Sequence, residues 1–250
     1  MTGIFENINH ILLYFFAVSL IIAFRYLITA GFFFYHFYIK NSLAYRDKRL
    51  SKRDFKKTQF QKEIKWSLIS SIIFAIPGVL LYYLYNMGFT KIYFNFTSED
   101  FWYVPLSLIS VLLLHETYYY WVHRWMHLPR VYKKVHKVHH DSLTPSPWTA
   151  FSFHPWEASI QAIIFPIIVI FLPLHIAIVL FYLIFMTLSS VINHLDIEIY
   201  PEKFQQSCFG KNIIGATHHH YHHSEFNTNY GLYFTFWDRW MKTESSQQHH

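Results

Sequence analysis

The sequence predicts an all-α integral membrane protein, and two observations lead to this fold class. The 250 residues are 53% hydrophobic and 21% aromatic but only 14% charged, whereas soluble domains carry roughly 25% charged residues. Apolar stretches that approach the length needed to cross a bilayer recur along the chain. The single cysteine, Cys208, excludes both a disulfide framework and a cysteine-based metal or redox site.

Three apolar stretches are long enough for membrane helices: residues 11–39, 66–87 and 101–120. The first is interrupted by Arg25 and His36, and no small-residue cleavage site follows it. We therefore interpret it as a membrane helix and not as a removed signal peptide. The second contains Pro77, where we expect a kink. A fourth apolar stretch, residues 158–192, is broken by two prolines and predicts a hairpin of two short spans or a re-entrant pair. The total is about four to five membrane helices.

The positive charge of the chain is concentrated in one place. Ten of the 21 lysines and arginines lie in residues 40–65. Such a run can indicate nucleic-acid binding, but its position between two apolar stretches favours a cytoplasmic loop that faces anionic lipid headgroups. With this loop in the cytoplasm, the chain after the third helix also emerges there. The polar segments that follow then predict a cytoplasmic helical cap.

Histidines provide the strongest functional signal. Fourteen of the 18 lie between His115 and His223. Spacings of three and four residues place imidazoles on one face of a helix, and this spacing occurs in three clusters: His123 and His127; His136, His139 and His140; His219, His222 and His223. For the isolated His10, His36 and His175 we expect ordinary packing roles.

Eight clustered imidazoles exceed what one ion binds, so the pattern predicts a dimetal site in the cap. Imidazole suits zinc, copper, iron and nickel. A histidine-rich double site at a membrane surface favours redox iron, and zinc remains the alternative. Nearby acids are candidates to orient the ligating rings from outside the site; they are Glu116, Asp141, Glu157, Asp196 and Glu225.

The motifs His115-x7-His123-x3-His127, His136-x2-His139-His140 and His218-His219-His220-x-His222-His223 resemble the fatty acid hydroxylase / sterol desaturase superfamily in order, spacing and context. Further matches lie at residues 149–157, Asn193-His194, Asn229-Tyr230-Gly231 and residues 236–240. The resemblance covers roughly residues 101–243. Residues 145–157 make the chain most similar to the sterol C-5 desaturase branch and its bacterial relatives.

The resemblance implies a membrane-bound non-haem di-iron enzyme with O2 as co-substrate. Such an enzyme hydroxylates or desaturates an unactivated C–H bond of a sterol or other lipid in lipid biosynthesis, and zinc can replace iron in purified protein. The metal ligands that it implies are His123, His127, His136, His139, His140, His219, His222 and His223, followed by His194 and His154. Residues implied beside the ligands are His115, His218, Glu116, Asp141 and Glu157. No catalytic residue beyond the metal site is expected.

The expected organisation is an N-terminal region of membrane spans and basic loop (residues 1–100), a catalytic region (residues 101–243) and a tail (residues 244–250). Electrons are expected from a separate b-type cytochrome or ferredoxin, and no nucleic acid partner is expected. Lys133, Lys134 and Lys137 could dock an acidic donor, and contact with lipid headgroups is the other interpretation.

Two other classes of protein remain alternatives. One is a histidine-rich membrane protein that binds or transports metal without oxygenase activity. Transporters hold their ligands near the membrane midplane, whereas these clusters follow the end of a span. The other is a bis-histidine haem protein, which needs paired histidines inside facing spans.

Overall fold

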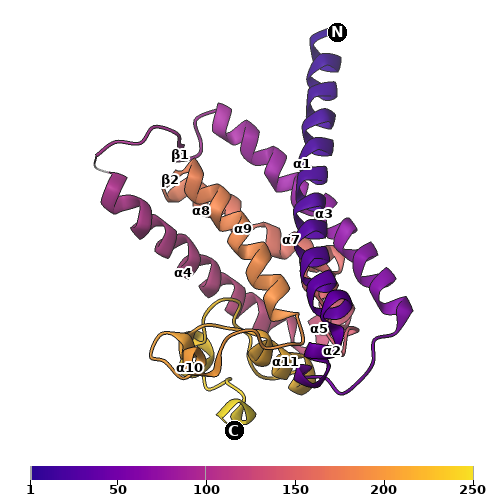
Figure 1. The fold of residues 1–250 in the computed structure, drawn as a ribbon. Coiled ribbons are helices and arrows are strands. Elements are labelled where there is room, and N and C mark those ends of the chain that lie inside the picture. Colours follow the sequence, from indigo (N-terminus) through magenta and orange to yellow (C-terminus); the bar gives the residue numbers. More distant parts are fainter. Residues whose placement is uncertain (1, 99, 250) are drawn as a thin grey trace.

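The computed structural model describes residues 2–98 and 100–249, most of which are helical (Figure 1). Among these residues, three helices are long and apolar enough to cross a membrane: Ile8–Lys40, Thr58–Asn86 and Ile176–Asn193. They confirm the membrane-protein class. Helix α4 (Asp100–Met126), which contains the third expected span, is not among them, so the count of four to five spans stays a prediction.

The first two long helices pack against each other along the membrane-crossing part of the fold. Helix α1 (Thr2–Phe34) continues into the π-helix η1 (Tyr35–Lys40), and it contacts α3 (Lys57–Asn86). A Cβ atom on Gly78 would lie 3.0 Å from Val18 Cγ1. A glycine at this position therefore lets the two backbones approach closely.

A second set of helices leads away from the histidine-rich end and returns to it. Helices α7 (Pro155–Ala162) and α8 (Ile164–Phe171) lead out, and α9 (Ile176–Asn193) leads back (Figure 1). At the far end, β1 (Ile92–Tyr93) pairs in parallel with β2 (Leu174–His175). This path agrees with the expected out-and-back course of residues 158–192.

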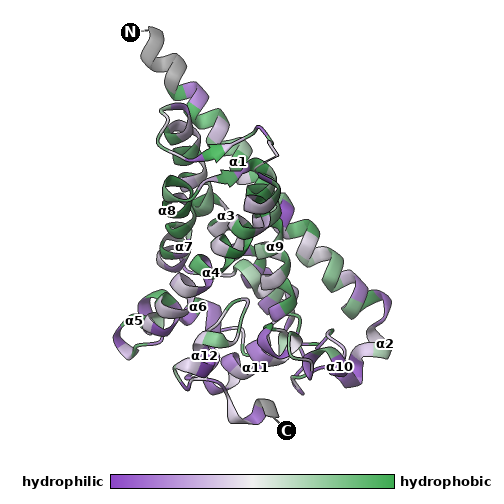
Figure 2. Cartoon of the chain, turned by 90° about the vertical axis from the view of Figure 1, so that its left-hand side faces the viewer, coloured by the Kyte–Doolittle hydropathy of each residue, from purple (hydrophilic) through white to green (hydrophobic). Residues whose placement is uncertain are grey.

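The polar end consists of short helices that connect and cover the ends of the long ones. They are α2 (Ser42–Tyr45), η2 (Arg46–Lys48), α5 (Pro129–Val135), α6 (Lys137–His140), η3 (Pro147–Phe151), α10 (Glu202–Gln205), η4 (Gly210–Asn212), α11 (Ala216–Glu225), α12 (Phe236–Trp240) and η5 (Ser246–His249). Hydrophobic residues dominate the long helices, and hydrophilic ones gather at this end (Figure 2).

The basic loop, residues 40–65, lies at the same polar end. Arg49 Nε lies 3.4 Å from Asp196 Oδ2, and the Leu50 amide donates to the Asp196 carbonyl at 2.9 Å. Asp196 follows α9 and precedes α11. The loop is therefore attached to the same segment that joins two of the histidine-bearing elements.

Buried Glu63, in α3, organises the chain that follows the second histidine cluster. Its carboxylate accepts hydrogen bonds from Ser142 Oγ at 2.7 Å, Ser146 Oγ at 2.7 Å and Thr149 Oγ1 at 2.9 Å. The Gln59 amide donates to it as well, at 2.7 Å. One charged group therefore satisfies four donors and holds residues 142–149 against α3.

Replacement of Glu63 by alanine should destabilise the fold, because three buried hydroxyl groups lose their acceptor. The expected loss is at least about 2 kcal/mol, since each unsatisfied buried group costs roughly 1–3 kcal/mol. The measurement is the melting temperature of the purified protein in detergent. Glu202→Ala, at an exposed position of α10, is the matched control. Equal melting temperatures for Glu63→Ala and this control would contradict the assignment.

Candidate metal centre

Four helices bring their histidines together where they end or turn. Helix α4 carries His123, and His127 follows its last residue. His136 lies between α5 and α6, and His194 follows α9. The remaining members belong to the short helices α6 and α11, and they are His139, His140, His219, His222 and His223. All nine are buried except His127, which is half-buried.

These nine histidines form two groups. One contains His123, His127, His136, His140 and His222; the other contains His139, His194, His219 and His223. Within each group the candidate ligand atoms lie within 4.8 Å of one another. Together the groups contain every one of the eight clustered histidines, and His194 completes the second.

The two groups do not follow the order of the sequence clusters. In α11, His219 and His223 lie one helical turn apart and enter the second group, whereas the side chain of His222 enters the first. His139 and His140 are adjacent in α6 and also enter different groups. Each of these short helices therefore contributes to both groups.

Within the groups the Nε2 atoms approach one another closely. In the first group, His123 Nε2 lies 3.0 Å from His136 Nε2, which lies 3.1 Å from His140 Nε2. His140 Nε2 lies 3.1 Å from His222 Nε2. In the second group, the corresponding contacts are His139–His194 at 3.2 Å, His194–His219 at 2.9 Å and His219–His223 at 3.1 Å.

Backbone carbonyls determine which ring nitrogen carries the proton. His123 Nδ1 lies 2.8 Å from the Tyr230 carbonyl, and His222 Nδ1 lies 2.7 Å from the Thr228 carbonyl. His194 Nδ1 lies 2.7 Å from the Ser190 carbonyl. Because a carbonyl only accepts, Nδ1 is the donor in each ring, and Nε2 of the neutral imidazole presents a lone pair to its group.

The close contacts of the first group cannot all be hydrogen bonds between neutral rings. His123 and His222 occupy the two ends of a row of four Nε2 atoms, and both are acceptors. The three contacts can then share at most two protons, from His136 and His140. A cation can accept lone pairs from the whole row.

The spacing also fits a metal ion. Two imidazole nitrogens that lie at right angles about 2.1 Å from one ion are about 3.0 Å apart, close to the observed Nε2 contacts. Burial favours the neutral, metal-binding form, because it lowers the pKa of both His194 and His222 to about 4. The donor set is imidazole throughout, which suits iron, zinc, copper or nickel.

Of the acidic residues expected beside the ligands, one contacts a histidine ring and two do not. Glu157 Oε1 lies 2.8 Å from His136 Nδ1, so it contacts a ring of the first group directly. Glu116 instead accepts from the backbone amides of Leu232 and Tyr233. Asp141 is exposed and pairs with Lys137.

Three histidines that match family positions lie outside both groups. His154 caps α7, where its Nδ1 accepts from the Trp156 amide at 3.3 Å. His115 Nδ1 lies 2.8 Å from Tyr182 Oη and 2.9 Å from Tyr233 Oη. His218 Nε2 lies 3.3 Å from Asp238 Oδ2. The structure therefore does not bring His154 together with the nine histidines.

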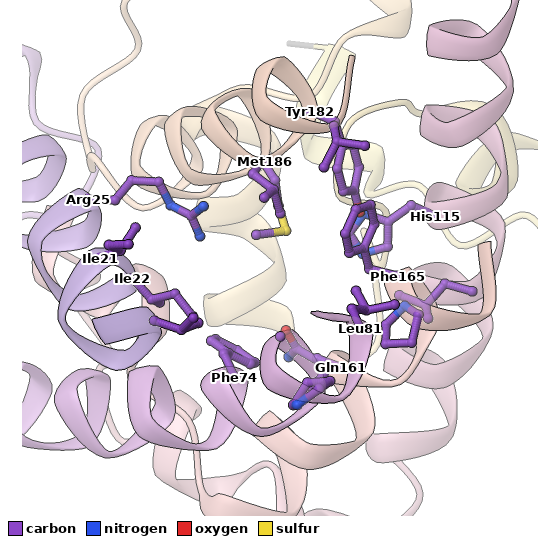
Figure 3. Close-up of a pocket in the computed structure, with 18 of the residues that line it drawn as sticks. Ile21, Ile22, Arg25, Phe74, Leu81, His115, Gln161, Phe165, Tyr182 and Met186 are labelled. Carbon is purple, nitrogen blue, oxygen red and sulfur yellow. The ribbon is translucent and has the colours of Figure 1, made fainter. Parts of the chain in front are cut away.

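An apolar cavity of about 430 Å³ extends among α1, α3, α4 and α7–α9 and reaches the second group, since His194 lines it. Figure 3 shows Phe74, Leu81, Phe165 and Met186 around it, with His115 on one side. Its volume lies in the range of ligand pockets. The arrangement places a hydrophobic ligand beside a group of imidazoles.

Of the groups that contact the rings, only Glu157 was identifiable from the sequence. The carbonyls of Ser190, Thr228 and Tyr230 belong to the backbone, and side-chain identity gives no signal for them. Tyr182 and Tyr233, which contact His115, lie in apolar or aromatic stretches that resemble ordinary core. Asn229-Tyr230-Gly231 was the only hint, as part of the resemblance.

A family model and individual related proteins both match this chain, and both indicate the family that the histidine motifs resemble. The fatty acid hydroxylase model matches residues 108–243. The chain is 31% identical to lathosterol oxidase of Mus musculus over 239 residues, 94% of this chain and 72% of the mouse protein. No solved structure matches the chain.

Two further relatives are matched over less of their length. Lathosterol oxidase of Homo sapiens is 32% identical over 188 residues, 74% of this chain and 61% of the human protein. A Delta(7)-sterol 5(6)-desaturase of Gibberella zeae is 30% identical over 227 residues, 87% of this chain and 64% of the fungal protein. The chain thus spans less than two thirds of both proteins. These relatives are named as oxidases and desaturases, which are oxidoreductases. Because the family model matches more than half of this chain, the chain belongs to the fatty acid hydroxylase family.

Proposed function

We propose that this protein is a membrane-bound, O2-dependent lipid hydroxylase or desaturase. The observation that carries the proposal is the convergence of nine histidines in two groups beside an apolar cavity. Imidazole groups of this kind suit redox iron, and a cavity among membrane helices suits a lipid. The names of the relatives support a sterol or another lipid as the substrate.

In this proposal, each histidine group would hold one iron ion, and bound iron would supply the O2 activation needed to oxidise a C–H bond. The chain itself orients the ligands. The carbonyls behind His123, His194 and His222 hold the Nδ1 protons and direct Nε2 inward, and Glu157 does the same for His136. The apolar walls of the cavity exclude water from the reacting carbon.

The proposed location of the site is the cytoplasmic face of the membrane. The basic loop and the histidine groups lie at the same end of the fold, and basic loops are retained in the cytoplasm. A cytoplasmic site also gives a soluble electron donor access to the cap. Lys133 and Lys134 are exposed there, where they could attract an acidic b-type cytochrome or ferredoxin.

The first prediction from the proposed function concerns metal content. Wild-type protein should contain about two iron ions per chain. His222→Ala removes a ligand from the first group, and His219→Ala removes one from the second; each should lower the iron content and abolish turnover. His220→Ala is the matched control, because His220 lies on the same helix but outside both groups. His154→Ala should also retain its metal, because His154 caps α7.

The measurement is elemental analysis of protein purified from membranes, with iron and zinc quantified separately. Active wild-type protein without any metal would refute the proposal. Metal loss in His220→Ala as large as in His219→Ala would show that the two groups are wrongly assigned.

A second prediction concerns the product. Lipids from cells that express the wild-type protein should contain species with one additional oxygen or two fewer hydrogens than their precursors. Cells that express His222→Ala should lack them, because the first group is incomplete. Comparative lipid mass spectrometry provides the measurement. Metal-loaded wild-type protein that changes no lipid would instead favour a metal-binding or transport protein.

A third prediction concerns topology. A cysteine introduced at exposed Lys52, in a Cys208→Ser background, should resist a membrane-impermeant thiol reagent in intact cells and react after permeabilisation. A cysteine at exposed Asn95, in the loop at the opposite end of the fold, should show the reverse. Labelling of the Lys52 position from outside would overturn the cytoplasmic assignment.

A further inference from the structure

Arg25 presents a positive charge to the apolar cavity. It lies in the membrane-crossing part of α1 and lines the cavity together with Ile21 and Ile22. Figure 3 shows its guanidinium extending from α1 into the space opposite Met186. The Nε atom is buried and has no hydrogen-bond partner. The head of this side chain is therefore directed at the cavity.

The cavity offers Arg25 no counter-ion. Among the described residues that line it, there is no aspartate or glutamate, and Arg25 is the only lysine or arginine. The polar neighbours have other partners: Ser190 Oγ donates to the Ala150 carbonyl, Gln161 Nε2 donates to Glu157, and Tyr182 Oη contacts His115.

Arg25 is partly buried, and a charge that is partly removed from water without an acidic partner is unfavourable. A purely structural arginine would be expected to contact an acid or several carbonyl groups, as Arg239 does with Glu244, Asn212 and the Lys211 carbonyl. The environment of Arg25 instead has the properties of a binding site in which the ligand brings the negative charge.

We propose that the cavity binds a lipid carboxylate, with the carboxylate on Arg25 and the hydrocarbon extending toward His194. The inference rests on the proposed function and names its substrate class. A guanidinium binds a carboxylate through two parallel hydrogen bonds, and one carboxylate neutralises one arginine. A hydroxyl group would leave the charge uncompensated, and a phosphate monoester carries about −1.5 to −2 charges, more than Arg25 can balance.

The test measures binding, and so requires no turnover. Purified protein in detergent is titrated with hexadecanoic acid, hexadecan-1-ol, hexadecyl phosphate and lathosterol, and binding is followed by native mass spectrometry. Hexadecanoic acid should bind about tenfold to a hundredfold more tightly than the alcohol, as expected for a charge-assisted pair. Arg25→Met should remove this preference, and Arg25→Lys should retain part of it.

The matched control is Lys203→Met, which removes a positive charge from an exposed position of α10 and should leave the preference unchanged. Arg25→Met should fold, because it removes a charge that has no acidic partner among the described residues of the cavity, and its melting temperature and metal content should match or exceed those of the wild type. Equal binding of acid and alcohol by the wild type would overturn the proposal. So would a preference retained in Arg25→Met, or tighter binding of lathosterol or the phosphate than of the acid.

The outcomes separate this inference from the proposed function. If carboxylate binding depends on Arg25 but the protein oxidises no lipid, the binding site is supported and the proposed oxygenase function is refuted. If the protein oxidises lipids but its ligand binding does not depend on Arg25, the oxygenase function is supported and the carboxylate site is refuted.

Discussion

The structure depends on the convergence of imidazole lone pairs in the interior of the cap. Backbone carbonyls accept hydrogen bonds from Nδ1 of His123, His194 and His222. Neighbouring Nε2 atoms then lie 3.0–3.1 Å apart in the first group and 2.9–3.2 Å apart in the second. Such an arrangement is unfavourable without a cation. A bound metal would stabilise this close approach of imidazole nitrogens, and it would thereby hold the ends of α4, α6, α9 and α11 together.

Local spacing made the histidine clusters predictable, since residues three and four apart share a helix face. The membrane class was predictable from composition. The division into two groups was not, because it depends on how α6 and α11 lie between their neighbours: the adjacent His139 and His140 face different groups. Proximity in sequence also misleads at Asp141, which follows His140 directly but is exposed, whereas Glu157 reaches His136 from a different helix.

Two charged residues of the long helices differ in their surroundings, and the difference separates a structural role from a role in ligand binding. Glu63 receives four hydrogen bonds from Gln59, Ser142, Ser146 and Thr149, so its charge is fully used within the protein. Arg25 faces a cavity lined by no acid among the described residues. In the sequence Arg25 interrupts an apolar stretch and Glu63 lies in the basic segment before the next one. Only the packing of α1, α3 and α9 shows their different surroundings.

The shared use of α6 and α11 has a mechanical consequence. Both histidine groups lack carboxylates among the residues that the structure describes, so no acidic side chain spans the gap between them. The position of one group relative to the other would then depend on the backbones of α6 and α11, in which adjacent histidines belong to different groups. A displacement of either helix would therefore disturb both histidine groups at once.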